Sequence, residues 1–290
     1  MPLNTSGFPS PEPRVPSPES VTSRALILAR GLGTRMRSPD AATLLSEAQQ
    51  RAADAGLKAM MPIGGRPFLD YVLSSAADAG LARIAIVVAP DHAELRRYYE
   101  SVSPPARVAI DFVVQAEPRG TADAVLAAER WVDGDDFLAM NGDNLYPAAI
   151  LSALRSLAGP GLPGFDPVEL VRSSNIPEDR VRAFALLESD ARGYLTHIIE
   201  KPSAAAAARL GASARVSMNC WRFDARIFEA CRAVRPSPRG ELELPAAVSL
   251  AMARGMEFRV LPAAGPVLDL SQRADAPDVA RRLSGTIPQP

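Results

Sequence analysis

Lysine, cysteine and histidine are all scarce in this sequence of 290 residues. Of its 32 basic residues only Lys58 and Lys201 are lysines, and there are two cysteines and two histidines. Cys220 and Cys231 form no CxxC pair, so neither a zinc site nor a disulfide framework is predicted, and we expect a reducing compartment, the cytoplasm. The formal net charge is −1 and the arginines are spread along the chain. This charge pattern argues against nucleic acid as a partner.

Long hydrophobic runs are absent as well. The longest apolar stretches, such as residues 84–90, have the length of a strand and fall far short of the roughly 20 residues that cross a bilayer. We therefore expect no membrane partner. Residues 1–23 lack the apolar core of a signal peptide and are rich in proline. They are predicted to form a disordered or polyproline-like tail.

Strands and helices alternate through the first half of the chain. Residues 25–29 are a continuous apolar run that ends in a glycine loop, as a buried parallel strand does. The patterns that follow predict strands over 84–89, 108–114 and 137–140, and helices over 41–55, 68–79, 91–99 and 121–131. This βαβ spacing indicates an α/β fold of three αβα layers around a Rossmann-like, mostly parallel, doubly wound sheet.

The rhythm changes after Pro160. Strands are predicted over 168–171, 182–187, 194–199 and 214–222, followed by helices over 226–234 and 244–254. We expect a smaller, mixed substrate-binding lobe that continues the same sheet. The predicted organisation is thus a tail, 1–23, and one domain, 24–285, with halves 24–158 and 159–285.

The loop Gly31-Leu32-Gly33-Thr34-Arg35 follows the first strand, where backbone N–H groups can converge on an anion. A dinucleotide-binding fingerprint would need a third glycine at position 36, which is Met36, and no Gly-Lys-Ser/Thr follows as in a P-loop. Both lysines lie in short segments typical of phosphate handling, Lys58 to Pro62 and Glu200-Lys201-Pro202. An ammonium is a compact point charge that approaches a single phosphate oxygen without imposing a fork geometry.

Several motifs then occur in a characteristic order. They are residues 28–36, 58–62, Gln115 with 120–122, 141–143, 200–202 and 239–244. Together, over about residues 24–285, they resemble the sugar-1-phosphate nucleotidyltransferases, above all the small single-domain glucose-1-phosphate thymidylyl- and uridylyltransferases. The resemblance implies an Mg²⁺-dependent homo-oligomeric enzyme that makes an NDP-sugar and pyrophosphate from an NTP and a sugar 1-phosphate.

The resemblance also implies roles for residues of the nucleotide-binding half, 24–158. Arg35 would hold the departing pyrophosphate and Lys58 would reach the α-phosphate, so that these two, with Lys201, are the candidate catalytic residues. Gln115 would read the base, because one amide can both donate to and accept from a pyrimidine edge. This favours UTP or dTTP and leaves an adenylyl- or guanylyl-transferring relative as the alternative. The full set expected to bind the nucleotide is Leu28, Ala29, Gly31, Gly33, Thr34, Arg35, Gln115, Gly120 and Thr121.

The other half, 159–285, would bind the sugar phosphate. The resemblance assigns this task to Glu200, Lys201, Asn219 and Arg239, together with Gly142 of the first half. It assigns Mg²⁺ to Asp143 of the first half and Asp269 of the second. Hard carboxylate oxygens are the ligands that Mg²⁺ prefers.

Three departures from the family pattern qualify this assignment. Arg30 replaces a small residue, the stretch 36–57 is long enough to form a helical flap over the nucleotide, and Asn219 replaces a glycine. A side chain at 219 would crowd or hydrogen-bond the sugar, so the substrate need not be plain glucose 1-phosphate. It is expected to be a sugar 1-phosphate or a cyclitol phosphate of similar shape.

Two alternatives belong to other classes of protein. Asp269 is followed by Leu270-Ser271-Gln272 and not by the family's Gly-Thr, a departure that motivates a catalytically silent, nucleotide-sugar-binding regulatory protein. A dinucleotide-dependent oxidoreductase would need the glycine that Met36 replaces.

Overall fold

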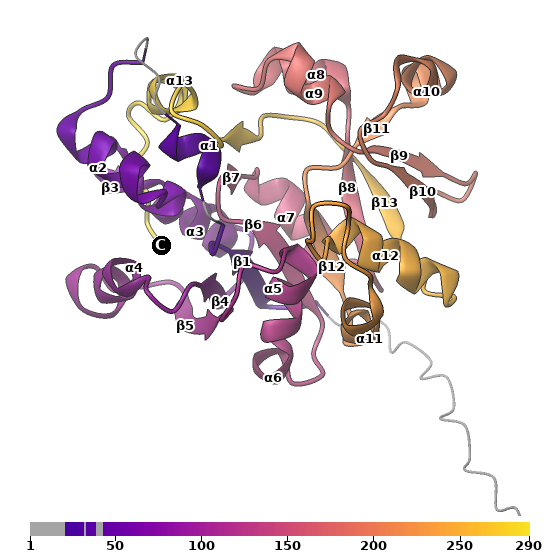
Figure 1. The fold of residues 1–290 in the computed structure, drawn as a ribbon, viewed down its shortest axis with the longest axis horizontal. Coiled ribbons are helices and arrows are strands. Elements are labelled where there is room, and N and C mark those ends of the chain that lie inside the picture. Colours follow the sequence, from indigo (N-terminus) through magenta and orange to yellow (C-terminus); the bar gives the residue numbers. More distant parts are fainter. Residues whose placement is uncertain (1–20, 32, 39–42) are drawn as a thin grey trace, which may run out of the picture.

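A ten-stranded mixed sheet forms the centre of the molecule (Figure 1). The computed structural model of the chain describes residues 21–31, 33–38 and 43–290. Along its main path the sheet has the order β10-β9-β11-β8-β12-β6-β1-β4-β5, and β13 pairs with β8. Its strands are β1 (Arg24–Leu28), β4 (Arg83–Val88), β5 (Ala109–Val114), β6 (Phe137–Asn141), β8 (Gly161–Phe165), β9 (Leu186–Ser189), β10 (Leu195–Ile199), β11 (Arg215–Val216), β12 (Cys220–Phe223) and β13 (Arg259–Ala263).

The sheet is parallel in the first half of the chain and largely antiparallel in the second. β6, β1, β4 and β5 are parallel neighbours, whereas β12 runs antiparallel to β6 and β9 antiparallel to β10 and β11. The predicted fold, a doubly wound α/β sheet continued by a smaller mixed lobe, is confirmed. Two short ladders lie outside the sheet, β2 (Pro62–Ile63) with β3 (Arg66–Pro67) and β7 (Asn144–Leu145) with β14 (Leu268–Asp269).

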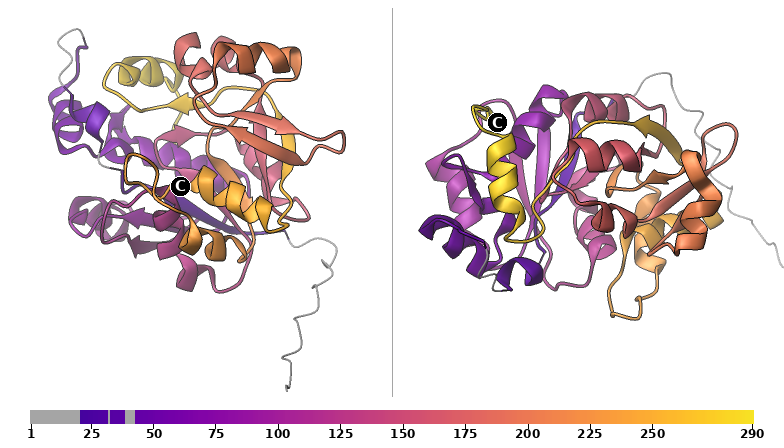
Figure 2. Two further views of the ribbon diagram at one scale, coloured as in Figure 1. Left: turned by 45° about the vertical axis from the view of Figure 1, so that its right-hand side comes forward. Right: turned by 90° about the horizontal axis from the view of Figure 1, so that it is seen from above.

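Helices cover both faces of the sheet (Figures 1 and 2). In β1, Ala25 and Ile27 enter one hydrophobic core and Leu26 enters the other, as the two-residue period of a strand requires. The first core is covered by α3 (Phe68–Asp78), α7 (Ala148–Arg155) and α13 (Asp275–Arg282), and the second by α5 (Thr121–Ala127), α11 (Ile227–Ala233) and α12 (Leu244–Ala253). The shorter helices are α1 (Thr34–Arg37), α2 (Glu47–Ala55), α4 (Ala93–Arg97), α6 (Glu129–Val132), α8 (Pro167–Ser173), α9 (Glu178–Arg182) and α10 (Ala204–Leu210).

Of the strand predicted over 182–187, only residues 186–187 lie in β9, because α9 extends to residue 182. A second predicted strand is wrong. Residues 168–171 belong to α8, which begins with Pro167 in its first turn. The Asp166 carboxylate caps this helix, accepting from the N–H of Val168 at 2.9 Å and of Glu169 at 3.1 Å. An Asp-Pro start is a known helix signal that outweighs the β propensity of two valines here.

The predicted tail falls mostly on residues 1–20, which lie outside the described residues. Thr22, which the sequence places in that tail, is buried. Its N–H donates to the Arg155 carbonyl at 3.2 Å and its hydroxyl to the Asp136 carbonyl at 2.5 Å. The packed part of the molecule therefore includes Thr22, whereas the prediction placed the start of the domain at residue 24. Within the described part of the chain, no helix has both the length and the apolar character needed to cross a membrane.

Candidate active site

The carboxyl ends of the neighbouring strands β1 and β6 are in contact, at the end of the sheet where its parallel strands finish. The Gly142 N–H, just after β6, donates to the Leu28 carbonyl at 2.9 Å, and a Cβ on Gly142 would lie 3.1 Å from the same oxygen. The Ala29 N–H donates to the Val87 carbonyl of β4 at 3.0 Å. Loops that leave such strand ends form the ligand-binding edge of open α/β sheets.

The glycine loop packs against the segment that carries Lys58. Gly33 has a φ of +63°, and a Cβ there would lie 2.4 Å from the Gly56 carbonyl oxygen, so only glycine fits. The Lys58 N–H donates to that same oxygen at 3.0 Å. Thr34 and Arg35 are exposed in α1, and within the described residues the Arg35 guanidinium makes no hydrogen bond or ion pair.

Lys58 and Asp143 form an ion pair. Lys58 Nζ lies 2.8 Å from Asp143 Oδ2, and the side chains are 19% and 23% exposed. The other carboxylate oxygen, Oδ1, accepts no hydrogen bond from any described residue. Asp143 therefore presents one unoccupied oxygen beside an ammonium group.

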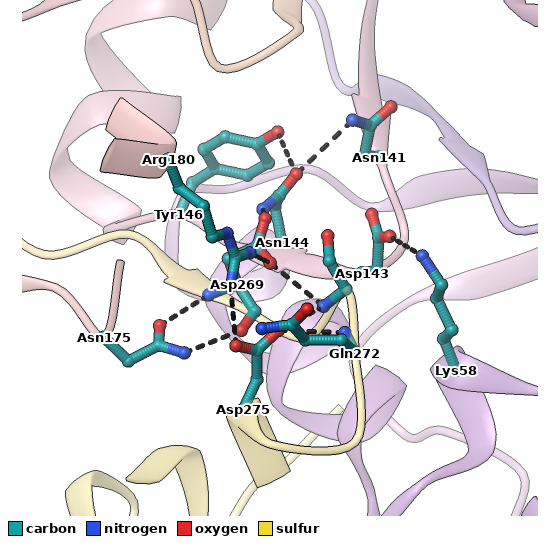
Figure 3. Close-up of polar contacts among 11 residues, drawn as sticks. Lys58, Asn141, Asp143, Asn144, Tyr146, Asn175, Arg180, Asp269, Gln272 and Asp275 are labelled. Atoms are coloured by element: carbon teal, nitrogen blue, oxygen red, sulfur yellow. Dashed lines mark hydrogen bonds and ion pairs between the residues drawn. The ribbon is translucent and has the colours of Figure 1, made fainter. Parts of the chain in front are cut away.

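Asp269 is brought beside Asp143 by the β7–β14 ladder, in which it pairs with Asn144. The Leu270 N–H donates to the Asp143 carbonyl at 2.9 Å. Burial, and next the charge of Asp143, raise the pKa of Asp269, while Arg180 acts in the opposite direction. The structure thus places the two predicted metal ligands within electrostatic reach of each other (Figure 3).

The two carboxylates differ in their fit to a metal ion. Asp143 offers a free oxygen. Asp269 does not, because Oδ1 accepts from Arg180 and from the Ser271 N–H, and Oδ2 accepts from the Asn144 amide. Across the described residues, no group of three or more histidine, cysteine, aspartate or glutamate side chains could hold a metal. A divalent cation here would need further ligands, such as water or phosphate oxygens of the substrate.

Gln115 lies at the end of β5 and is only 3% exposed. Its Nε2 donates to the Gly120 carbonyl at 3.0 Å and to Asp123 Oδ2 at 2.8 Å. Because an amide NH₂ has two protons and both are used, the side chain keeps only its oxygen for a ligand. Gln115 is predicted to donate to the base and to accept from it, but this geometry leaves its side chain as an acceptor only. Arg30 Nε donates to the Gln115 carbonyl at 3.3 Å.

The motif at 120–122 is bonded directly to the motif at 239–244. The Ala122 N–H donates to the Leu242 carbonyl at 2.8 Å, and the Thr121 hydroxyl accepts from the Leu244 N–H at 2.9 Å. A Cβ on Gly120, whose φ is +113°, would lie 2.5 Å from the Leu242 oxygen. Segments over a hundred residues apart therefore meet through a contact that only glycine permits.

Charged residues gather next to this junction. Arg239 pairs with Glu243 at 2.7 Å and with Glu241 at 3.6 Å. The residue Glu200 as a whole is exposed, but its carboxylate is partly desolvated by its neighbours. This desolvation and the charge of Glu243 raise the pKa of Glu200, while the charges of Lys201 and Arg239 act in the opposite direction. Glu200, Lys201, Arg239 and Glu243 therefore form one cluster, called the acidic–basic cluster below.

Asn219 and Lys201 adopt left-handed backbone conformations, with φ of +56° and +47°. Asparagine tolerates this region better than most residues, which explains how it can stand at a position where the family pattern predicts glycine. The Asn219 side chain is exposed and has no hydrogen-bond partner among the described residues. It precedes Cys220, which pairs with Met140 of β6, so Asn219 lies beside the strand end that leads to Asp143.

Several polar residues around Asp269 escaped prediction. Asn144 directly follows the Asn-Gly-Asp motif, and a polar run after a buried strand is a signal that could have found it. The sequence gives no comparable signal for Arg180 or Asn175, which reach Asp269 from the α8–α9 region.

Known proteins of similar sequence include sugar-phosphate nucleotidyltransferases. The chain is 27% identical over 260 residues to a UTP–glucose-1-phosphate uridylyltransferase, AglF, of Haloferax volcanii, which covers 90% of this chain and 96% of the relative. It is also 27% identical over 274 residues to a glucose-1-phosphate thymidylyltransferase of Streptomyces antibioticus, covering 91% of this chain and 69% of that protein.

Solved structures share the fold. A UDP-glucose pyrophosphorylase complexed with UDP-glucose superposes with a TM-score of 0.68 at 17% identity, covering 91% of this chain and 99% of that one. A UTP-bound UGPase from Acinetobacter baumannii gives a TM-score of 0.69 at 18% identity, covering 92% and 95%. The model of the nucleotidyl transferase family matches residues 24–265. This match spans most of the chain, and the protein therefore belongs to the nucleotidyl transferase family.

Proposed function

We propose that this protein transfers the nucleoside monophosphate of UTP or dTTP to a sugar 1-phosphate, or to a cyclitol phosphate of similar shape, and releases pyrophosphate. The observation that carries the proposal is the Lys58–Asp143 pair at the carboxyl end of β6. The glycine loop packs beside Lys58, and Asn219 lies next to the same strand end. Two anionic substrates need cations and metal ligands in this arrangement.

On the nucleotide side, the loop that includes Gly31, Gly33 and Thr34 would bind the triphosphate through backbone N–H groups, beside Leu28 and Ala29. Arg35 is exposed and has no partner among the described residues, so it can take the pyrophosphate. The Gln115 oxygen, with Gly120 and Thr121 beside it, would accept from a ring N–H of the base, as uracil and thymine offer at N3. A guanine N–H or an amino group would also suit an acceptor, so the adenylyl- or guanylyl-transferring alternative is kept.

On the sugar side, Lys201 and Arg239 would bind the phosphate, and Glu200 would accept hydrogen bonds from hydroxyl groups. Gly142 leaves room at the strand end, and the Asn219 amide would contact the ring. The family pattern has a glycine at position 219 and so no side chain there. For this reason the proposal includes cyclitol phosphates and the 1-phosphates of sugars other than glucose.

The proposed reaction is an in-line displacement. An oxygen of the sugar phosphate forms a bond to the α-phosphorus of the NTP, the bond from that phosphorus to the bridging oxygen of the β-phosphate breaks, and pyrophosphate leaves with those electrons. Lys58 would move from Asp143 toward the α-phosphate and stabilise its developing charge. A unit charge pair about 4 Å apart is worth about 4 kcal/mol at an effective dielectric constant near 20.

Members of this family generally use a divalent metal. We propose Mg²⁺ as that metal and Asp143 as its protein ligand, because one Asp143 oxygen is free. When bound, the ion would neutralise charge on the phosphates and align them. Asp269, the other predicted ligand, has no free oxygen in this arrangement.

The test incubates the purified protein with Mg²⁺, each NTP and a panel of sugar 1-phosphates and cyclitol phosphates, and measures pyrophosphate. Release that depends on both substrates is the expected result. Folded protein that releases no pyrophosphate with any combination contradicts the proposal. If nucleotide still raised the melting temperature in that case, the regulatory alternative would hold. Cytoplasmic location, homo-oligomeric assembly and the residue roles stay predictions.

A further inference from the structure

Both oxygens of the Asp269 carboxylate accept hydrogen bonds from protein donors (Figure 3). Besides Arg180, Oδ1 accepts from the Ser271 N–H at 2.9 Å, and Oδ2 accepts from Asn144 Nδ2 at 3.0 Å. The Asn175 amide fixes its backbone, accepting from the Asp269 N–H at 2.8 Å and donating to its carbonyl at 2.7 Å. The side chain is 7% exposed, so a metal ion that approached either oxygen would meet a protein donor already bound there.

Arg180 is itself held firmly. It extends from α9, is 17% exposed, and bridges Asp269 to Asp275, with Nη1 at 2.6 Å from Asp275 Oδ1. Asp275 in turn accepts from the N–H groups of Ser271 and Gln272, each at 2.9 Å. Moving the guanidinium away would leave two buried carboxylates without their shared cation, an arrangement that is strongly unfavourable.

Asp143 has the opposite surroundings. It is more exposed than Asp269, and only Oδ2 is engaged, by Lys58. Mg²⁺ is commonly bound by one or two carboxylates together with water and substrate phosphates, so one aspartate is enough when a triphosphate is present.

We propose that the Arg180 guanidinium is the cation that neutralises Asp269. It occupies the position that a divalent ion would take if Asp269 were the second carboxylate ligand of that ion. Asp269 is then a positioning residue. It fixes β14 against β7, and the neighbouring Leu270 N–H holds the Asp143 carbonyl at 2.9 Å. The ion is held by Asp143 and the phosphates of the nucleotide. This inference rests on the proposed function.

The first experiment uses Mn²⁺ as the probe, with the α,β-methylene analogue of UTP or dTTP. The paramagnetic resonance signal of free Mn²⁺ gives its affinity for wild type, Asp143→Asn and Asp269→Asn in the presence of the nucleotide. We expect Asp143→Asn to weaken Mn²⁺ binding at least about tenfold, and Asp269→Asn to change it by less than about threefold. Equal losses in the two variants would overturn the inference. If the wild type forms no complex of protein, nucleotide and Mn²⁺, the proposed function fails instead.

The second experiment measures Mn²⁺ binding to the protein alone. Arg180→Gln frees the Asp269 carboxylate, and we expect the affinity to rise about tenfold, because a second carboxylate then faces the ion. Arg182→Gln is the matched control, since it removes the same charge from the same helix at a side chain that is 75% exposed and pairs with Glu178. The double variant Arg180→Gln/Asp269→Asn should lose the gain.

An Arg180→Gln affinity no higher than that of Arg182→Gln would overturn the proposal, as would a gain that survives in the double variant. Near-ultraviolet circular dichroism shows whether each variant is folded. If Arg180→Gln does not fold, the comparison of Asp143→Asn with Asp269→Asn decides the question alone.

Discussion

Lys58 provides the sharpest prediction at the scale of single residues. Its ammonium lies 2.8 Å from Asp143, and its side chain is mostly buried. Arginine would keep the charge but put a planar fork where a point charge fits. We expect Lys58→Arg to lower kcat by about a hundredfold, as misplacement of a catalytic group does, and to leave the melting temperature nearly unchanged. Steady-state pyrophosphate release and thermal unfolding measure the two effects.

Lys201→Arg is a companion variant and should also lose activity, because Lys201 belongs to the acidic–basic cluster on the sugar side. Arg182→Lys, at an exposed position outside both clusters, should retain full turnover. Full turnover in both lysine variants would mean that neither position needs a point charge, and their place in phosphate-handling segments would be coincidence.

Glu200 provides a prediction about pH. Burial and the charge of Glu243 raise its pKa in the folded protein above the unfolded value. A raised carboxyl pKa means that the folded state is relatively favoured below the unfolded pKa and loses that advantage as the pH rises through the folded pKa. Glu200→Gln should therefore raise the melting temperature at neutral pH, and the difference from wild type should vanish below about pH 4. A difference that persists at low pH would exclude this cause.

The predicted site residues differ in how far the sequence could place them. Lys58 and Asp143 each follow from a local motif, but their pairing depends on how β6 and the 58–60 turn pack, and the motifs alone do not give it. Arg180 is harder still, because it lies 89 residues before Asp269 in a polar segment that resembles a solvated helix face. Its partner becomes visible only when α9 and β14 are placed in space.

At the scale of elements, the sequence predicts the first half well and the second half less well. Strands such as 84–89 are apolar runs buried on both faces, and these are easily recognised. β8 has the sequence Gly-Leu-Pro-Gly-Phe, which is typical of a turn, yet it is fully buried. Its glycines are required by packing, since a Cβ at Gly161 would lie 2.5 Å from the Arg259 carbonyl oxygen and one at Gly164 would lie 2.7 Å from Val260. That requirement comes from β13, which is distant in sequence.

The junction between the 119–122 and 242–244 segments gives a prediction at this scale. A methyl group at Gly120 would lie 2.5 Å from the Leu242 oxygen, and the backbone there has a φ of +113°. Gly120→Ala should therefore destabilise the protein by about 1–3 kcal/mol, the cost of strain at such a position, and should displace Gln115, which bonds the Gly120 carbonyl. Urea unfolding gives the stability and the KM for nucleotide reports the displacement.

Gly134→Ala is the matched control for this junction. Gly134 also has a positive φ, of +81°, but a Cβ there would have nothing within 4 Å. Gly134→Ala therefore has the backbone penalty of a positive φ but makes no steric contact. If Gly134→Ala were as destabilising as Gly120→Ala, and the KM for nucleotide were the same in both variants, the close approach to Leu242 would have no energetic weight.

At the scale of the whole molecule, the two halves of the chain share one sheet and two cores. β12 of the second half pairs with β6 of the first, so the sheet is continuous across the boundary predicted near residue 158. The two cysteines report on the two faces separately, since Cys220 lies in one hydrophobic core and Cys231 in the other. A continuous sheet should make both cores unfold together.

The thiols make this testable. Both are buried, and burial raises the pKa of Cys231 to about 12 and that of Cys220 still further, so almost no thiolate is present at neutral pH. Neither should react with a disulfide reagent in the native protein. Cys220→Ser and Cys231→Ser each leave one reporter, and labelling in rising urea should give the same midpoint for both once each variant's own stability is subtracted. Two separate midpoints would show that the two faces of the sheet unfold independently.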